Sequence, residues 1–176
     1  LQGACIDIWG VGTKLITSAD CPALGGVYKL SAELVDGHYV PKIKISENVA
    51  KITTPCFKEV WRIFDRETDK AIADVITLND EVIDDEKPYT IFDPNHTWKR
   101  KTVENFRAVR LRTQLFKNGE CLYQPRALSA IRAHCLAQVD TLWEEVTRFE
   151  NPHSYYVDLS QKLWDEKNRL LSENQY

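Results

Sequence analysis

The chain has 176 residues, 43% of them hydrophobic and 28% charged, which is enough to bury one substantial core and is ordinary for a globular protein. A formal net charge of −3 gives no overall reason to expect a nucleic acid or an anionic membrane as partner. No apolar run reaches the length of a membrane span, and nothing at the start has the pattern of a signal peptide, so we expect a cytoplasmic protein without a membrane contact.

The start of the chain predicts a buried strand followed by a glycine-rich loop. The sequence holds no methionine, and Leu1 leads directly into the apolar run ACIDIW. We therefore expect a piece of a longer polypeptide whose first strand lies inside a parallel sheet or barrel. Gly10, Gly12 and Thr13 follow as GVGT, where glycines let consecutive backbone amides point at one anion and the threonine adds a hydroxyl donor. Because ligands of α/β folds bind at the C-terminal ends of strands, we interpret GVGT as a phosphate-binding loop, with a plain tight turn as the alternative.

From Val27 onwards the sequence alternates between apolar and polar residues, which predicts a middle region built from local antiparallel hairpins. The first has Asp36-Gly37 at its tip, the second joins KEVWRIFD to KAIADVITL through RETD, and the third turns at Asn118-Gly119. The stretch NDEVIDDEKP is acidic and poor in apolar residues, so we interpret it as a solvated connection.

After Pro125 the apolar period changes to that of a helix. One apolar stripe predicts a long helix that Pro152 ends; its members are Leu128, Ile131, Cys135, Val139, Leu142, Val146 and Phe149. A last helix follows, for which Asp158 or Ser160 can serve as the N-cap.

Three lysines can add positive charge to an anion site. In a hairpin that turns at Asp36-Gly37, residues whose numbers sum to about 73 lie opposite each other, as Lys29 and Lys44 do, and Lys51 follows shortly after. Like charges directly opposed destabilise a sheet, so this pair favours a shared polyanion. Two solvated lysines that lean apart are equally compatible with the spacing.

The densest basic run, WKRKTVENFRAVRLR, has aromatic residues among its cations, as segments that bind single-stranded nucleic acid do. The acidic chain as a whole and the lack of a nucleic-acid-binding motif favour a solvated or interface-forming face instead.

No catalytic set and no metal site follow from the remaining residues. The four histidines (His38, His96, His134 and His153) are isolated and lack metal-ligand spacing. The five cysteines have no CxxC pair, which favours free thiols over disulfides or zinc.

Four segments, in order, resemble the C-terminal part of the nicotinate phosphoribosyltransferase family, bacterial members more than animal ones: DIWGVGTKLITSADCPALGGVYKL, KIKISENVAKITTP, WKRKTVENF and NPHSYYVDLSQKLWD. The resemblance covers essentially the whole chain and about the last third of such a protein. It implies an α+β fragment of an α/β-barrel type II phosphoribosyltransferase. Residues 1–26 would form a late barrel strand with its phosphate loop. Residues 27–124 would form a β-rich part of a second domain shared with a missing N-terminal part, and residues 125–176 the C-terminal helices.

The same resemblance implies a function. Members of the family convert nicotinate and phosphoribosyl pyrophosphate to nicotinate mononucleotide and pyrophosphate in NAD biosynthesis, with ATP hydrolysis and Mg²⁺. By resemblance, Gly10, Gly12 and Thr13 would hold the nucleotide 5′-phosphate, and the three lysines would approach phosphates across a homodimer. The phosphorylated histidine and the acidic ribose motif of the family would lie upstream of Leu1, so we expect no catalytic residue in this chain and no activity of the chain alone.

Two alternatives remain at this point. The chain could belong to another barrel enzyme that grips a phosphate, such as a nicotinamide or quinolinate phosphoribosyltransferase, or it could be a non-catalytic module that docks through WKRK. The sequence also departs from the family pattern: Val49-Ala50 replaces a common proline–acid pair, and Cys56 stands where glycine is usual. The cysteine predicts that the backbone at residue 56 does not need a positive φ, or that the local turn differs.

Overall fold

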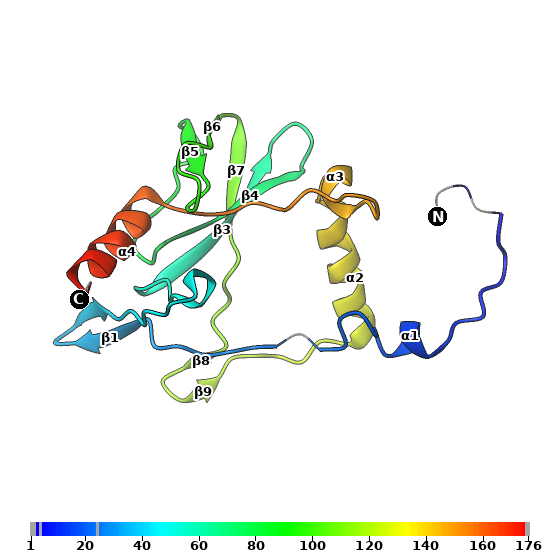
Figure 1. The fold of residues 1–176 in the computed structure, drawn as a ribbon, viewed down its shortest axis with the longest axis horizontal. Helices are drawn as coiled ribbons and strands as arrows, with labels where there is room; N and C mark the ends of the chain where they lie inside the picture. The colour runs from blue at the N-terminus through cyan, green and yellow to red at the C-terminus, as the bar shows by residue number, and fades with distance from the viewer. Residues whose placement is uncertain (1–2, 4, 24, 175–176) are drawn as a thin grey trace.

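The structure is a computed structural model, and it describes residues 3, 5–23 and 25–174. At its centre lies a four-stranded sheet with the strand order β10-β4-β3-β7 (Figure 1). Its strands are β3 (Lys58–Asp65), β4 (Ala71–Leu78), β7 (Phe106–Arg110) and β10 (Val157–Leu159). The strands β3, β4 and β7 pair antiparallel, and β10 runs parallel to β4.

The β3–β4 hairpin is the one that the alternating pattern on either side of RETD predicts, and the structure confirms it. Its register pairs Lys58 with Leu78 and shifts between Ile63 and Phe64. Asp65 stabilises the turn, because its Oδ1 accepts hydrogen bonds from the Thr68 amide at 2.8 Å and the Thr68 hydroxyl at 3.0 Å.

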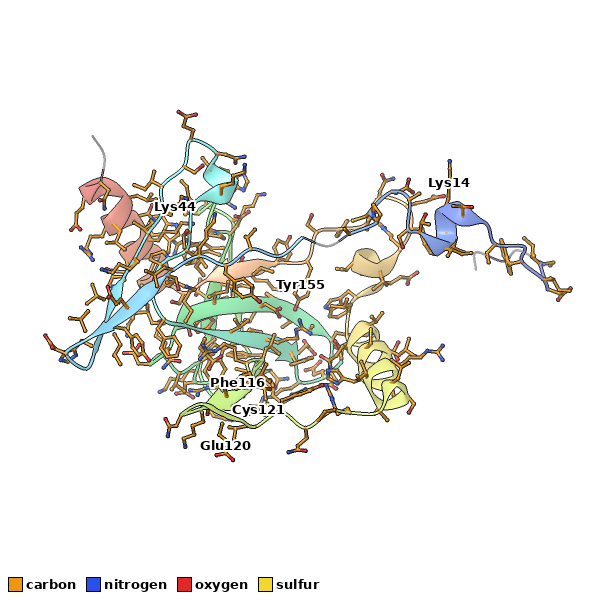
Figure 2. The ribbon with its side chains drawn as sticks, turned by 90° about the horizontal axis from the view of Figure 1, so that it is seen from below. Lys14, Lys44, Phe116, Glu120, Cys121 and Tyr155 are labelled. Carbon is orange, nitrogen blue, oxygen red and sulfur yellow. The ribbon has the colours of Figure 1, made fainter. Side chains whose placement is uncertain are left out.

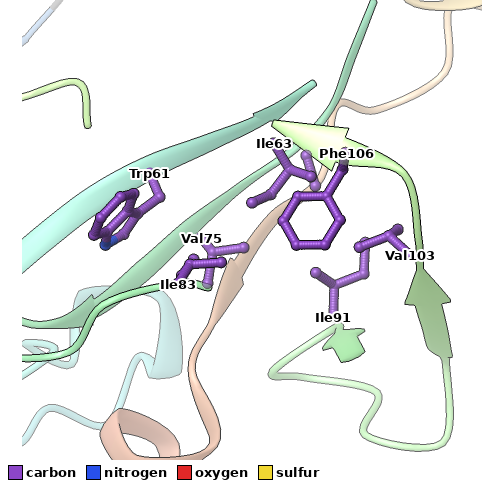
Figure 3. Close-up of a cluster of buried hydrophobic side chains, with 8 residues drawn as sticks. Trp61, Ile63, Val75, Ile83, Ile91, Val103 and Phe106 are labelled. Carbon is purple, nitrogen blue, oxygen red and sulfur yellow. The ribbon is translucent and has the colours of Figure 1, made fainter. Parts of the chain in front are cut away.

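One face of this sheet carries the main hydrophobic core (Figure 3). The hairpin of β5 (Tyr89–Phe92) and β6 (Arg100–Val103) covers that face. The buried members of the core are Trp61, Ile63, Ala73, Val75, Ile83, Ile91, Val103 and Phe106. Ile83 corrects one expectation: the stretch NDEVIDDEKP is a connection, yet this residue is only 6% exposed, because a single apolar side chain in a polar segment is drawn into the nearest core.

The opposite face is covered near the C-terminus by α4 (Gln161–Glu173), which packs on β4. Leu159 and Leu163 form a small second core with Cys56. Ser160 is the N-cap of α4, since its hydroxyl oxygen accepts a hydrogen bond from the Leu163 amide at 3.2 Å. Asp158 belongs to β10 and takes no part in the cap.

The two smaller predicted hairpins also form. β1 (Ala32–Val35) pairs with β2 (His38–Pro41), and the partners' numbers sum to 73, as predicted. At its tip Asp36 and Gly37 have φ of 49° and 80°, the positive values that a tight hairpin turn requires. β8 (Phe116–Lys117) and β9 (Glu120–Cys121) form the third hairpin, which turns at Asn118-Gly119.

The long helix predicted after Pro125 is shorter than expected. α2 (Leu128–Asp140) ends before Thr141, and α3 (Glu144–Thr147) is a separate single turn, so the stripe does not run unbroken to Phe149. The C-terminal end of α2 reaches the central sheet, where Gln138 accepts a hydrogen bond from Arg62 at 3.3 Å. The rest of the helix stands apart (Figure 1), and its apolar side chains lie on the surface, with Leu128 80% and Leu136 53% exposed. Helical periodicity therefore predicts the element correctly, but nothing in the described chain covers its apolar face.

The strand expected at the start of the chain is not formed. Residues 5–12 are irregular, and Ile6, Ile8 and Trp9 are 47%, 88% and 59% exposed; Ala4, the first residue of the expected strand, lies outside the described residues. The physical reason is that a strand needs neighbouring strands to satisfy its backbone hydrogen bonds, and none runs alongside this segment (Figure 1). Within the part of the chain that the structure describes, no helix has the length and apolarity to cross a membrane.

Cys56 provides another correction. Its φ is +78°, so the backbone adopts the left-handed conformation of the glycine that is usual there, and the substitution does not mark a relaxed turn. Lys58 Nζ stabilises this turn, since it donates hydrogen bonds to the carbonyl oxygens of Thr54 at 2.9 Å and Cys56 at 2.7 Å.

Candidate phosphate-binding site

The glycine-threonine loop lies in the exposed N-terminal segment, immediately before the single turn α1 (Thr13–Ile16). Gly12 has φ of −113° and ψ of −173°, which is ordinary extended backbone. A Cβ placed on Gly10 or Gly12 would meet nothing within 4 Å. The glycines are therefore not needed for backbone conformation or for packing in this chain; what they offer is an unobstructed approach to the main chain.

The backbone amides of this loop are open to a ligand. Gly12 contributes its carbonyl oxygen, which accepts hydrogen bonds from the amides of Leu15 at 3.1 Å and Ile16 at 3.2 Å. Between described residues, we find no hydrogen bond donated by the amides of residues 10–13. An anion that reaches the loop would thus not compete with an internal acceptor.

The three predicted lysines gather in one region, near the β1–β2 hairpin. Lys29 Nζ donates a hydrogen bond to the carbonyl oxygen of Lys51 at 2.6 Å, and the carbonyl oxygen of Lys44 accepts one from the Thr53 amide at 3.3 Å. All three side chains are exposed, and no described carboxylate forms an ion pair with any of them. They form a cluster of cations without a bound counter-charge.

Within one chain the loop and the lysines do not meet. Figure 2 shows Lys14, which follows the loop directly, at the opposite end of the molecule from Lys44. A phosphate held by the amides of residues 10–13 would therefore not contact Lys29, Lys44 or Lys51 of the same chain. The lysine cluster would likewise need an anion that this loop does not hold.

Sequence reasoning missed Asp158 as a candidate functional residue, because it treated the residue as a possible helix cap. The structure places this carboxyl, only 4% exposed, in the lining of two surface hollows. Burial and the neighbouring Asp93 raise its pKa to about 6. The alternation in YYVDLS was the available signal, since it predicts a strand with Asp158 on one face and Leu159 on the other.

Comparisons with known proteins give the family. Residues 57–167 match the family described as the nicotinate phosphoribosyltransferase C-terminal domain. The chain is 45% identical over 172 residues to the nicotinate phosphoribosyltransferase of Bacillus subtilis (strain 168), a match that covers 98% of this chain and 35% of that protein. The enzyme of the same name from Caenorhabditis elegans is 34% identical, with 96% and 30% covered, and the one from Homo sapiens is 27% identical, with 97% and 31% covered. The chain thus spans about a third of the length of these curated relatives.

The solved structures agree at the level of the fold. The crystal structure of human nicotinic acid phosphoribosyltransferase superimposes with a TM-score of 0.59, covering 66% of this chain and 23% of that chain at 21% identity. The expected α+β class is thereby confirmed. The barrel strand is not formed in this chain, and the phosphate role of its loop stays a prediction.

Proposed function

Because the chain belongs to the family of nicotinate phosphoribosyltransferase C-terminal domains, we propose that it is the C-terminal part of an enzyme that converts nicotinate and phosphoribosyl pyrophosphate to nicotinate mononucleotide and pyrophosphate, a step of NAD biosynthesis. The observation that carries this proposal is the 45% identity to a nicotinate phosphoribosyltransferase across 98% of the chain. The nicotinamide and quinolinate enzymes remain less well supported, since no relative reported above bears either name.

In this proposal the amides of residues 10–13 hold the 5′-phosphate of the nucleotide, with the Thr13 hydroxyl as a further donor. The support is that these amides have no internal acceptor and that the approach over Gly10 and Gly12 is open. Successive main-chain N–H groups that converge on one oxyanion bind it without needing a charged side chain.

Lys29, Lys44 and Lys51 would meet that phosphate from the other copy of a homodimer. Their separation from the loop of the same chain and their lack of carboxylate partners support this arrangement (Figure 2). In a two-fold symmetric dimer each copy would give its lysines to the partner's loop and receive the partner's lysines in return.

The chemistry would be a displacement at C1 of the ribose, with positive charge developing on the sugar and negative charge on the departing pyrophosphate. Groups of this chain would act by position and charge: amides hold one phosphate in place, and ammonium groups screen the anionic ligand. None of these groups exchanges a proton with the substrate, so the acid–base residues would belong to the remainder of the enzyme.

Among the described residues, there is no group of three or more His, Cys, Asp or Glu side chains that could hold a metal ion by protein ligands alone. We therefore assign both the Mg²⁺ and the ATP that the family implies to the remainder of the enzyme, and no step here depends on them.

The remainder of the polypeptide is also the partner that would cover the exposed apolar surfaces. Ile8 is 88% exposed, Trp9 59% and Leu136 53%, and α2 as a whole has no buried residue. Apolar surface of this extent on a folded chain marks an interface.

The test is an assay of nicotinate mononucleotide formation by the purified chain alone and by the chain combined with the N-terminal two thirds of the Bacillus subtilis relative. We expect activity only in the combination. Formation of the product by the chain alone would refute the proposed division of roles. If the active combination used quinolinate or nicotinamide better than nicotinate, the proposed substrate would be wrong.

Gly12→Ala gives this test its sharpest variant. The fold tolerates the methyl group, since Gly12 has ordinary extended dihedrals and open space around it. We expect kcat/KM of the active combination to fall by about tenfold or more, because the Cβ would stand between the amides and the phosphate. Gly26→Ala, at a position equally open and not assigned to the loop, is the matched control. If charge reversal at Lys99 and Lys101 abolished activity while Gly12→Ala spared it, the docking-module alternative would be preferred.

A further inference from the structure

Two adjoining hollows, of about 610 Å³ and 620 Å³, lie where the β5–β6 hairpin faces the segment that enters β10. They share four lining residues: Asp93, Lys99, Tyr156 and Asp158. Volumes of this size are typical of sites that bury a small molecule. The hollows belong to the folded part of the chain, and neither is lined by residues of the proposed phosphate loop or by the lysine cluster.

Asp158 is a buried acceptor that lines both hollows and has no side-chain partner among the described residues. β10 pairs it with Val75, so its side chain lies on the core face of the sheet, and the residue is 4% exposed. Among the described residues, none donates a hydrogen bond to its carboxylate or forms an ion pair with it. Its carboxylate oxygens are not among the sealed atoms without a partner, so they face the hollows and can accept N–H groups supplied from outside.

The neighbouring carboxylates do not compete for such a ligand. Asp93 accepts the amides of Asn95 at 2.8 Å and His96 at 3.2 Å, and its Oδ2 lies 2.8 Å from His96 Nδ1. Asp65, which also lines the second hollow, accepts hydrogen bonds from the amides of its own turn. Asp158 is therefore the acceptor that remains open.

The residues that line the second hollow indicate which class of ligand it would bind. Trp143 and Tyr156 line the second hollow and offer flat apolar surfaces, whereas Phe92 is buried and has the Arg100 guanidinium 4.9 Å from its ring centre. Lys99 and Lys101 stand at its rim, exposed, and no described carboxylate forms an ion pair with either. Cations around the mouth disfavour a simple ammonium ligand and favour a ligand with an anionic end.

We propose that this cavity binds a guanine nucleotide, with Asp158 accepting the two adjacent N–H donors of the base edge, the aromatic side chains flanking the ring and the basic rim facing the phosphate. A carboxylate and a planar pair of N–H donors form two parallel charge-assisted hydrogen bonds, the same match that makes arginine–carboxylate pairs strong. Ring stacking on aromatic side chains adds affinity for any base but does not select guanine. The selection comes from Asp158, because adenine lacks the paired donors.

The experiment is isothermal titration calorimetry of the 176-residue chain with GMP, IMP, AMP and guanosine at pH 7.5. We expect GMP to bind at least about tenfold more tightly than IMP, which lacks one donor of the pair, and than AMP, which lacks both, and more tightly than guanosine, which lacks the phosphate. Asp158→Asn should remove the preference for GMP over IMP. Lys99→Gln with Lys101→Gln should weaken GMP binding and leave guanosine binding unchanged, with Arg100 as the basic lining residue that remains.

The controls separate this proposal from its competitors. Glu120→Gln, an exposed carboxylate in another sheet, should leave every affinity unchanged. Circular dichroism of each variant establishes that a lost signal is not lost folding. The proposal is overturned if no nucleotide binds, or if GMP binds no better than inorganic phosphate. It is also overturned if methylguanidinium binds as tightly as GMP, because the cavity would then be a binding site for an arginine side chain of a partner protein.

Discussion

At Cys56 the side chain and the backbone have opposite requirements. The residue is buried against Leu159 and Leu163, yet its φ of +78° costs a residue with a Cβ about 1 kcal/mol or more. Cys56→Ala and Cys56→Gly both remove the sulfur, but only glycine relieves the backbone. We therefore expect Cys56→Gly to be more stable than Cys56→Ala by about 1 kcal/mol in urea unfolding followed by tryptophan fluorescence. Cys135 in α2 is the control, because in a helix interior the order of the two variants should reverse. Equal stability of the two Cys56 variants would show that the turn is not strained.

The buried Asp158 predicts a dependence of stability on pH. Its pKa is raised to about 6 by burial and by Asp93, so the folded state holds this proton more tightly than the unfolded chain does. The ionised carboxylate therefore destabilises the fold above about pH 6, and this loss disappears as the pH falls towards 4. We expect Asp158→Asn to raise the free energy of unfolding at pH 7.5 by at most about 3 kcal/mol, with the gain vanishing near pH 4. A gain independent of pH would contradict this, and Glu120→Gln is the control.

Single residues were predictable from sequence where the rule is local. The turn residues Asp36 and Gly37 and the cap at Ser160 follow from the chemistry of a few neighbouring positions, and the structure bears them out. The burial of Ile83 depends on core residues from other strands. The hollow beside Asp158 is lined mostly by residues more than 50 positions earlier in the chain, and no local pattern contains that information.

Among the elements, the β3–β4 hairpin depends on a polar network on one of its faces. Arg62 and Asp74 are cross-strand partners joined by two hydrogen bonds of 2.8 Å and 2.9 Å, and the Tyr155 hydroxyl donates to Asp74 Oδ1 at 3.0 Å. The Asp74 hydrogen bonds raise the pKa of Arg62, and burial followed by the Asp74 carboxylate raises the pKa of Tyr155. The network thus attaches the segment before β10 to the centre of the sheet.

Removing one partner of this network should be costly. We expect Arg62→Ala to lower the free energy of unfolding by about 3 kcal/mol, because Asp74 would be left largely buried without its cation. Replacing both partners, as Arg62→Met with Asp74→Leu, should cost less than the single change, since no unpaired charge remains. Lys42→Ala, which breaks the exposed pair with Glu33, is the control and should change stability far less. The measurement is chemical unfolding of the wild type and the three variants. A double variant with a lower free energy of unfolding than Arg62→Ala would contradict an electrostatic cause.

Elements with local partners were predictable, and those with distant partners were not. All three hairpins are read correctly from alternation and turn residues. The β10 strand, which pairs with β4 some 80 residues earlier, and the β5–β6 pairing across the HTWKR turn were not foreseen. The apolar stripe predicted a helix at α2 but not its exposure, because periodicity reports amphipathicity and does not say which surface covers the apolar side.

For the whole molecule, the two halves of the proposed phosphate site lie apart, and this separation makes the dimer testable. One copy of the complete enzyme would carry Gly12→Ala and the other Lys29→Glu with Lys51→Glu, and each protein alone should be inactive or nearly so. In a mixed dimer, lysines that act across the interface restore one intact site, formed by the loop of the lysine variant and the lysines of the glycine variant. An equimolar mixture should then regain about one quarter of the wild-type activity, since half of the dimers are mixed and each has one working site of two.

The control for this mixture uses both changes on the same polypeptide. When that triple variant is mixed with the wild-type enzyme, each mixed dimer combines an intact loop with altered lysines at one site and an altered loop with intact lysines at the other. Neither site is complete, so activity should fall towards one quarter, where lysines acting within their own chain would leave one half. Recovery in the first mixture and the steeper loss in the second, both measured as nicotinate mononucleotide formed per total protein, distinguish an anion site shared between two copies from one in which each copy works alone.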